Sequence, residues 1–150
     1  MENEIRRESI AELEKRLRHI SGAIKQNGRK ILNNYPITSP QFIALQWLIE
    51  EGNLTIGELS QKNGLAFSTT TDLVDRMEKN NLVKRIKDEN DRRVVRIHVL
   101  DKGRNIIKEV IHKRQDFLGD VLETFSPSQV GELSELLKNL QKQMKIINDK

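Results

Sequence analysis

Apolar residues recur at helical spacing near both ends of the chain, and polar residues fill the positions between them. Before residue 34 and again after Pro127, the apolar residues stand mostly three or four positions apart. This spacing predicts two long amphipathic helices, each with a heptad-like apolar seam. Asn27-Gly28 is expected to loosen the first helix, whereas Ser126-Pro127-Ser128-Gln129 has the form of a capping box that starts the last one.

Both seams would remain in water if nothing covered them. They either pack on each other within one chain or interlock with the seams of a second copy, and their length favours a helical dimerisation region. The residues predicted to form that region are Ile10, Leu13, Leu17, Ile20, Leu133, Leu137, Leu140, Met144 and Ile147.

The sequence between residues 38 and 80 contains signals for three shorter helices. Thr38-Ser39-Pro40-Gln41 and Thr55-Ile56-Gly57-Glu58 predict two helix starts, and Asn63-Gly64 predicts the end of the second helix. Ser68 is expected to cap the third helix, which would run to about residue 80. Two short helices joined by a tight turn that contains glycine form a helix-turn-helix. One face of the third helix, Thr70, Leu73, Val74 and Met77, is expected to pack against Leu59, Leu65 and Leu82.

A hairpin is predicted directly after these helices. Residues 82–86 form one strand, and Val95, Ile97 and Val99 alternate with polar residues along its partner, while the loop between the strands has no apolar residue up to position 93. The predicted fold is therefore mainly α with a small β wing. Residues 38–100 form a winged helix-turn-helix domain, and residues 1–34 and 101–150 form the helical dimerisation region, with no independent linker.

The charge of the chain is concentrated on the wing. The net charge is +4, and the segment from Lys84 to Arg104 contains eight basic and four acidic residues, so it accounts for the whole excess. A local excess of positive charge is typical of a surface that binds a polyanion. The interpretation without a ligand is a solvated charged loop, and the preceding helix-turn-helix shifts the balance towards DNA.

Composition excludes several classes of function. The chain has no cysteine, which rules out disulfides, thiol redox sensing and zinc held by thiolates. Its three histidines lie in separate elements without a triad or metal-binding motif, so we expect neither an enzyme nor a metal or other cofactor. Nothing approaches the ~20 apolar residues of a membrane span. We therefore expect a cytoplasmic protein that does not bind membranes.

Four short motifs, in order, carry a resemblance to a known family. They are LVDRME at 73–78, NLVKR at 81–85, DENDRR at 88–93 and LDKG at 100–103. Together with the order of the predicted elements, they resemble the MarR family of bacterial transcription regulators over essentially the whole chain. The resemblance implies a homodimeric, sequence-specific DNA-binding regulator, most often a repressor that binds an inverted-repeat operator in double-stranded DNA. Relatives are often released from DNA by a small aromatic or phenolic effector.

The candidate DNA-binding residues lie on the third short helix and on the wing. Small hydroxyl side chains and an arginine on the outer face of a helix can reach base edges and phosphates in a major groove, and arginines at a wing tip can enter a minor groove. Asp88 and Asp91 are expected to brace these arginines and the turn. The predicted DNA-binding residues are Ser68, Thr69, Thr71, Asp72, Arg76, Lys87, Asn90, Arg92 and Arg93.

Two of the departures from the pattern of the family concern DNA contact. Asn90 stands where many relatives have arginine, and Asp72 would oppose phosphates unless it accepts from a cytosine amino group or pairs with Arg76. Trp47, Tyr35 and His19 could line an effector pocket near the hinge, although Trp47 by default belongs to the core.

The alternative function is a winged helix that binds a protein rather than DNA, which would lack steeply salt-dependent DNA binding.

Overall fold

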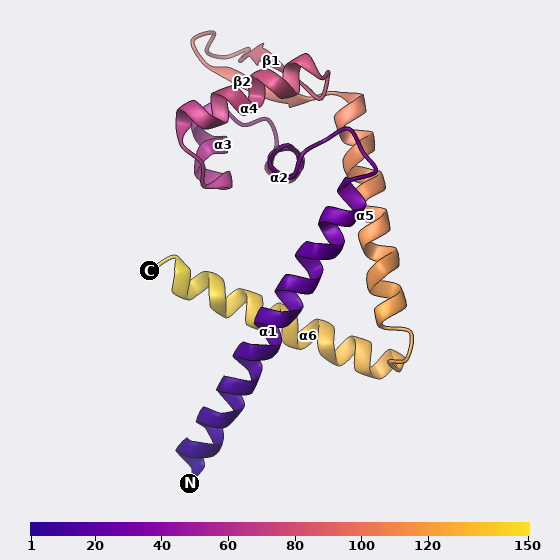
Figure 1. Cartoon of the computed structure of the whole chain (residues 1–150). Coiled ribbons are helices and arrows are strands. Elements are labelled where there is room, and N and C mark those ends of the chain that lie inside the picture. The colour runs from indigo at the N-terminus through magenta and orange to yellow at the C-terminus, as the bar shows by residue number, and fades with distance from the viewer. The chain divides into compact units, whose positions relative to one another are not determined.

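The computed structural model describes residues 1–150 and is mostly helical (Figure 1). The chain forms two compact units, residues 1–114 and residues 115–150. The fold class predicted from the sequence is confirmed, because six helices accompany one two-stranded antiparallel sheet. The elements are α1 (Glu2–Leu32), α2 (Ser39–Glu51), α3 (Ile56–Asn63), α4 (Phe67–Lys79), β1 (Val83–Lys87), β2 (Val95–Val99), α5 (Asp101–Val121) and α6 (Pro127–Asn148).

Reciprocal capping boxes start three of the helices, as predicted. The Thr38, Thr55 and Ser126 hydroxyls each accept a hydrogen bond from the backbone N–H three residues later, at 3.3, 3.2 and 3.1 Å. The side chain at that third position accepts from the N–H of the capping residue in return. Each box satisfies two backbone donors that a helix start otherwise leaves without a partner.

The predicted start of α4 is wrong. The helix begins at Phe67, and its N-cap is Ala66, which provides no side-chain hydrogen bond, so Ser68 lies within the first turn. The turn before α4 explains the difference. Gly64 adopts a left-handed conformation, with φ of 73°, and the Asn63 side chain accepts a hydrogen bond from the N–H of Leu65 at 3.0 Å. The turn is therefore completed, and the helix has begun, before the chain reaches Ser68.

Helix α1 is not loosened at Asn27-Gly28, contrary to the expectation. It continues without a break to Leu32, and Gly28 is buried. A Cβ atom at Gly28 would lie 2.8 Å from Nη2 of Arg114. Because Gly28 has no side chain, the guanidinium of Arg114 on α5 can approach the backbone of α1, and the two helices meet through this contact.

The core of the first unit is formed by α2, α3, α4 and the hairpin, together with the end of α1 and the first part of α5. Thr70, Val74 and Met77 are fully buried together with Leu59 and Leu82, as predicted for one face of α4. The packing predicted for Leu65 is wrong, since this residue is 38% exposed. Its place in the short turn between α3 and α4 directs the side chain away from the core.

The two strands of the wing pair in antiparallel register, from Val83 opposite Val99 to Lys87 opposite Val95. The base of the wing is tied to the rest of the unit, because the N–H of Ile97 donates to the carbonyl of Leu54 at 2.8 Å. Ile97 and Val83 are buried, whereas the tip carries only exposed or half-exposed side chains. The wing is thus anchored in the core at one end and open to solvent at the other.

The second unit contains the end of α5 and all of α6. No residue of α6 is buried, and most of its apolar positions are exposed, among them Ile147 at 66%. No helix of the chain combines the length and apolar character that a membrane span requires.

Candidate nucleic-acid interface

The outer face of α4 carries polar side chains directed into solvent. Ser68, Thr69, Asp72 and Arg76 are exposed, opposite the buried face of the same helix. Thr71 differs from them, since it is half-buried and its hydroxyl donates to the carbonyl of Phe67 at 3.0 Å. No ion pair joins Asp72 to Arg76, so the internal pairing considered for Asp72 is absent.

An arginine on β1 fixes the orientation of α4 relative to the wing. Nη2 of Arg85 lies 2.6 Å from Oδ1 of Asp75, and Nη1 lies 2.9 Å from Oε1 of Glu78. The backbone N–H of Arg85 also donates to Oε2 of Glu78, at 3.0 Å. This last bond is the main cause that lowers the pKa of Glu78, and the guanidinium adds to it against the opposing effect of burial. The carboxylate form of Glu78 therefore holds the strand to the helix.

The connection between α4 and β1 is equally tight. Asn81 adopts a left-handed conformation with φ of 61°, the N–H of Leu82 donates to the carbonyl of Met77, and the N–H of Asn81 donates to that of Glu78. This is the hydrogen-bond pattern of a Schellman motif. The wing consequently begins at a fixed direction from the end of the helix.

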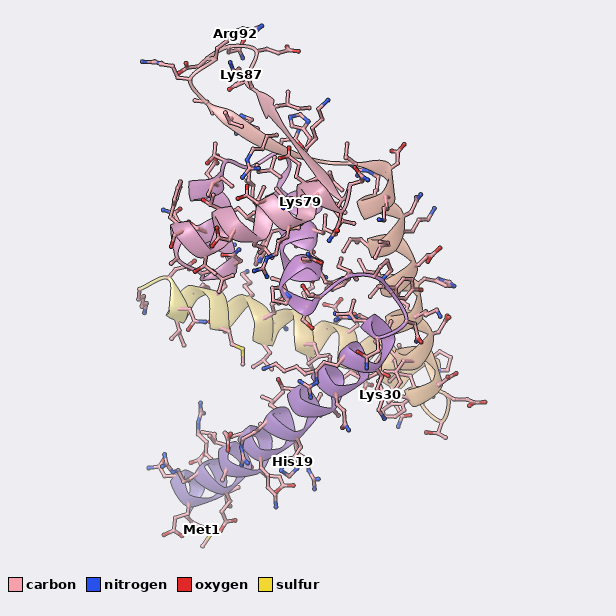
Figure 2. The ribbon with its side chains drawn as sticks, turned by 45° about the horizontal axis from the view of Figure 1, so that its top comes forward. Met1, His19, Lys30, Lys79, Lys87 and Arg92 are labelled. Atoms are coloured by element: carbon pink, nitrogen blue, oxygen red, sulfur yellow. The ribbon has the colours of Figure 1, made fainter.

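The wing tip presents the basic residues at the far end of the hairpin. Figure 2 shows Arg92 and Lys87 there, at a distance from Lys79 on α4. Asn90, Arg92 and Arg93 are all exposed. Two backbone hydrogen bonds, from Asp88 to the carbonyl of Val94 and from Val94 to that of Asp91, close the loop at 2.9 Å each.

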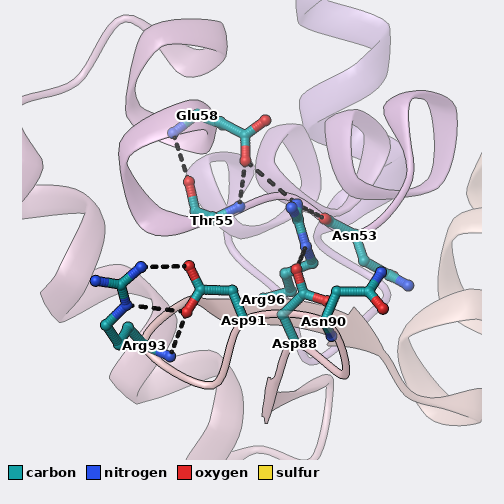
Figure 3. A network of polar contacts seen from close by, with 8 residues as sticks. All are labelled: Asn53, Thr55, Glu58, Asp88, Asn90, Asp91, Arg93 and Arg96. Atoms are coloured by element: carbon teal, nitrogen blue, oxygen red, sulfur yellow. Dashed lines mark hydrogen bonds and ion pairs between the residues drawn. The ribbon is translucent and has the colours of Figure 1, made fainter.

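Asp91 holds Arg93 by both its backbone and its side chain. Oδ1 of Asp91 accepts from the backbone N–H and from Nε of Arg93, each at 3.1 Å (Figure 3). The side-chain hydrogen bond from Arg93 is the main cause that lowers the pKa of Asp91. Because 91% of the Arg93 side chain is exposed, its guanidinium can exchange this carboxylate for another anion.

A second arginine, on β2, ties the wing to the start of α3. Nε of Arg96 lies 3.4 Å from Oδ2 of Asp88, and Nη1 lies 3.1 Å from the carbonyl of Asn53 and 3.4 Å from Oε1 of Glu58 (Figure 3). The pKa of Glu58 is lowered mainly by the N–H of Thr55, with a smaller contribution from Arg96. Asp88 thus braces the turn through the N–H of Asn90, at 3.2 Å, but the arginine it contacts is Arg96.

Arg85 and Arg96, which organise the site, were not among the site residues predicted from the sequence. Alternation along β2 could have placed Arg96 on the face opposite Ile97, but not beside Glu58, which is 38 residues away. The acidic pair Asp75 and Glu78 at the end of α4, followed by a tight turn and an arginine, was the available signal for the other contact.

A cleft in the first unit lies between α1, α2 and α5. It has a volume of about 250 Å³ and combines apolar and cationic side chains. It does not involve Trp47 or Tyr35, which pack around the edge of the core, or His19, which is exposed on α1. The cleft is lined by Lys25, Gly28, Arg29, Leu32, Ser39, Phe42, Ile43 and Arg114.

The helix-turn-helix, the hairpin and the polar outer face of α4 together define a winged helix-turn-helix regulator. Comparison with known proteins agrees. The sequence model of the MarR family matches residues 37–95. The uncharacterized HTH-type transcriptional regulator YsmB of Bacillus subtilis is 58% identical over 138 residues, which cover 92% of this chain and 94% of YsmB. The transcriptional repressor MprA of Escherichia coli is 26% identical over 81% of this chain and 70% of its own length.

A solved structure gives the same result for the fold. The structure of a MarR family protein from Bacillus stearothermophilus is similar with a TM-score of 0.88 and 58% sequence identity, over 91% of this chain and 96% of the other. The chain belongs to the MarR family of transcriptional regulators. This is a family of DNA-binding regulators and not of enzymes, so family membership confirms both of these predictions.

Proposed function

We propose that the chain is a homodimeric repressor that binds an inverted-repeat operator and releases it when a small aromatic ligand binds. The observation that carries the proposal is the combination, within one unit, of an exposed polar face on α4 and a basic wing fixed to that helix by Arg85. A bacterial transcriptional regulator must reach the chromosome, so we place this protein in the cytoplasm.

The homodimer is supported by the apolar stripes on the terminal helices. Leu13 is 60% exposed, and Ile10, Ile20, Leu137 and Met144 are also exposed. Contiguous apolar surface of this kind is typical of a protein interface. Residues 1–34 and 101–150 would form the dimerisation region, and a two-fold axis would place two copies of α4 about one turn of DNA apart, ~34 Å.

Each subunit would then contact one half-site through two elements. The outer face of α4, with Ser68, Thr69 and Arg76, would read base edges in the major groove. The wing tip, with Arg92 and Arg93, would contact phosphates or an adjacent minor groove. Two arguments support repression. The similar protein MprA is a transcriptional repressor. In addition, a protein bound at a promoter obstructs RNA polymerase.

The cleft between α1, α2 and α5 is our candidate for the effector site. Phe42 and Leu32 supply apolar surface, while Arg29 and Lys25 supply positive charge. Nε of Arg114 is buried without a hydrogen-bond partner, which is a cost that a ligand acceptor would remove. An aromatic ring with a phenolate or carboxylate group fits this lining. Such a ligand would release DNA only if it bound more tightly to a dimer whose two α4 helices are spaced wrongly for the major groove than to the DNA-binding dimer.

One experiment tests the core of the proposal. The full chain is examined by light scattering for its mass and by footprinting on genomic fragments from its source at moderate salt. We expect a dimer and a protected site with two-fold symmetry, whose affinity falls steeply as salt increases. A monomer that binds no duplex even at low salt would refute the proposal. That result would favour the alternative, a winged helix that binds a protein.

A further inference from the structure

Phe67 is an apolar residue at an unexpected place. It is the first residue of α4, directly before Ser68 and Thr69, and it is 61% exposed. The face of α4 that packs on the core does not include it, since the buried residues of the helix are Thr70, Val74 and Met77. The core therefore gives no reason for an aromatic side chain at this position.

The position of Phe67 directs its ring towards the leading end of the helix. Side chains on a helix lean towards its N-terminus, so the first residue covers the space ahead of the helix instead of its flank. One edge of the ring lies against the first turn of α3, because its Cε2 atom is 3.9 Å from the position of a Cβ atom at Gly57. The residue is otherwise exposed, and Ser68 and Thr69, our candidates for reading bases, follow it directly in the first turn of α4.

The chemistry of the ring restricts what it can recognise in a major groove. It has no hydrogen-bond donor or acceptor, whereas base edges in a major groove are mostly polar and the 5-methyl group of thymine is their largest apolar feature. Apolar contact with that methyl group is one of the ways in which proteins identify thymine. We propose that Phe67 packs against the 5-methyl group of one thymine in each half-site and thereby selects thymine over cytosine there. This inference rests on the proposed sequence-specific binding of an operator.

The test removes the methyl group from the DNA and the ring from the protein, separately and together. The full-length wild type first selects its preferred duplex from a random library. Each symmetric pair of thymines in that duplex is then replaced by deoxyuridine, and the dissociation constant is measured by fluorescence anisotropy for the wild type, Phe67→Ala, Phe67→Leu and Leu65→Ala. Leu65→Ala is the matched control, because Leu65 is also an exposed apolar residue and lies only two positions before Phe67.

We expect one thymine pair at which deoxyuridine weakens wild-type binding about fourfold for each methyl group lost, and so about sixteenfold for the pair. Phe67→Ala should lose this sensitivity, Phe67→Leu should keep part of it, and Leu65→Ala should keep all of it. Circular dichroism melting of the Phe67 variants checks that they remain folded.

Three results would overturn the inference. Deoxyuridine could be harmless at every position, or its penalty could be the same in Phe67→Ala as in the wild type. The second result would show that another part of the protein contacts the methyl group. If the wild type selected no sequence at all, the proposed operator binding would fall together with this inference, so the two failures are distinguishable.

Discussion

The arginine pair at the wing tip allows a quantitative test of how the protein holds DNA. Arg92→Ala combined with Arg93→Ala removes two exposed charges per subunit, and four in the proposed homodimer. Each phosphate contact contributes about 0.9 to the slope of log K against log salt. Loss of four contacts should therefore reduce the slope by about 3.6. When salt rises from 50 to 200 mM, the affinity of the variant for DNA should therefore fall by a factor about 150 times smaller than that of the wild type.

The chain offers a closely matched control. Arg6 and Arg7 are also adjacent and exposed, at the start of α1, so their replacement by alanine changes the net charge equally. Binding to the selected duplex and to random duplex is measured by anisotropy over the salt range, with the mass of each variant checked by light scattering. The reasoning fails if the wing variant changes the slope by less than one unit, or if the control variant changes it as much.

Three further substitutions, and one control substitution, test the site and the framework around it. Gly103→Ala should destabilise the fold by about 1–3 kcal/mol, because its Cβ would lie 2.6 Å from the backbone carbonyl oxygen of Leu82. Gly22→Ala is the control, and it should stabilise α1 slightly because there is open space around Gly22. Denaturant titrations that give similar effects for both variants would contradict this. The pKa of Glu78 is lowered from 4.5 in the folded protein, so its contribution to stability is present at neutral pH and is lost as pH falls below about 5. When melting temperatures are measured from pH 7 to 3, they should therefore fall less steeply with pH in Glu78→Gln than in the wild type. An equally steep fall in both would argue against the contact with Arg85. Arg76→Ala should relax the preference at one base pair by about 1–3 kcal/mol in a selection experiment, and a uniform loss on all sequences would assign Arg76 to phosphate instead.

The parts of the fold that depend on local chemistry could be predicted from the sequence. Capping boxes such as Thr55 with Glu58 use residues three positions apart, and the alternation around Ile97 gives the buried face of a strand. The start of α4 was missed because Asn63 and Gly64 act together on the turn. Ser68 is a good capping residue, but the chain has already entered the helix when it reaches that position.

The contacts that organise the site could be predicted only in part. Arg85 and Arg96 were visible as charges on the wing, yet their partners are chosen by the fold, since Arg96 meets Asn53 and Glu58 across more than 35 residues of sequence. The approach of Arg114 to Gly28 likewise joins residues that lie far apart in the chain. A pairwise contact of this kind leaves no periodic trace, and its prediction requires the tertiary structure.

The way in which the wing tip is closed has a consequence for diversification. Backbone hydrogen bonds and the Asp88 and Asp91 carboxylates shape the loop, whereas the side chains at positions 89, 90, 92 and 93 contribute nothing to the core. Residues can be exchanged at these four positions with little penalty in folding. Gene duplicates or laboratory libraries could therefore acquire new target preferences at the tip of the hairpin while they retain the same scaffold.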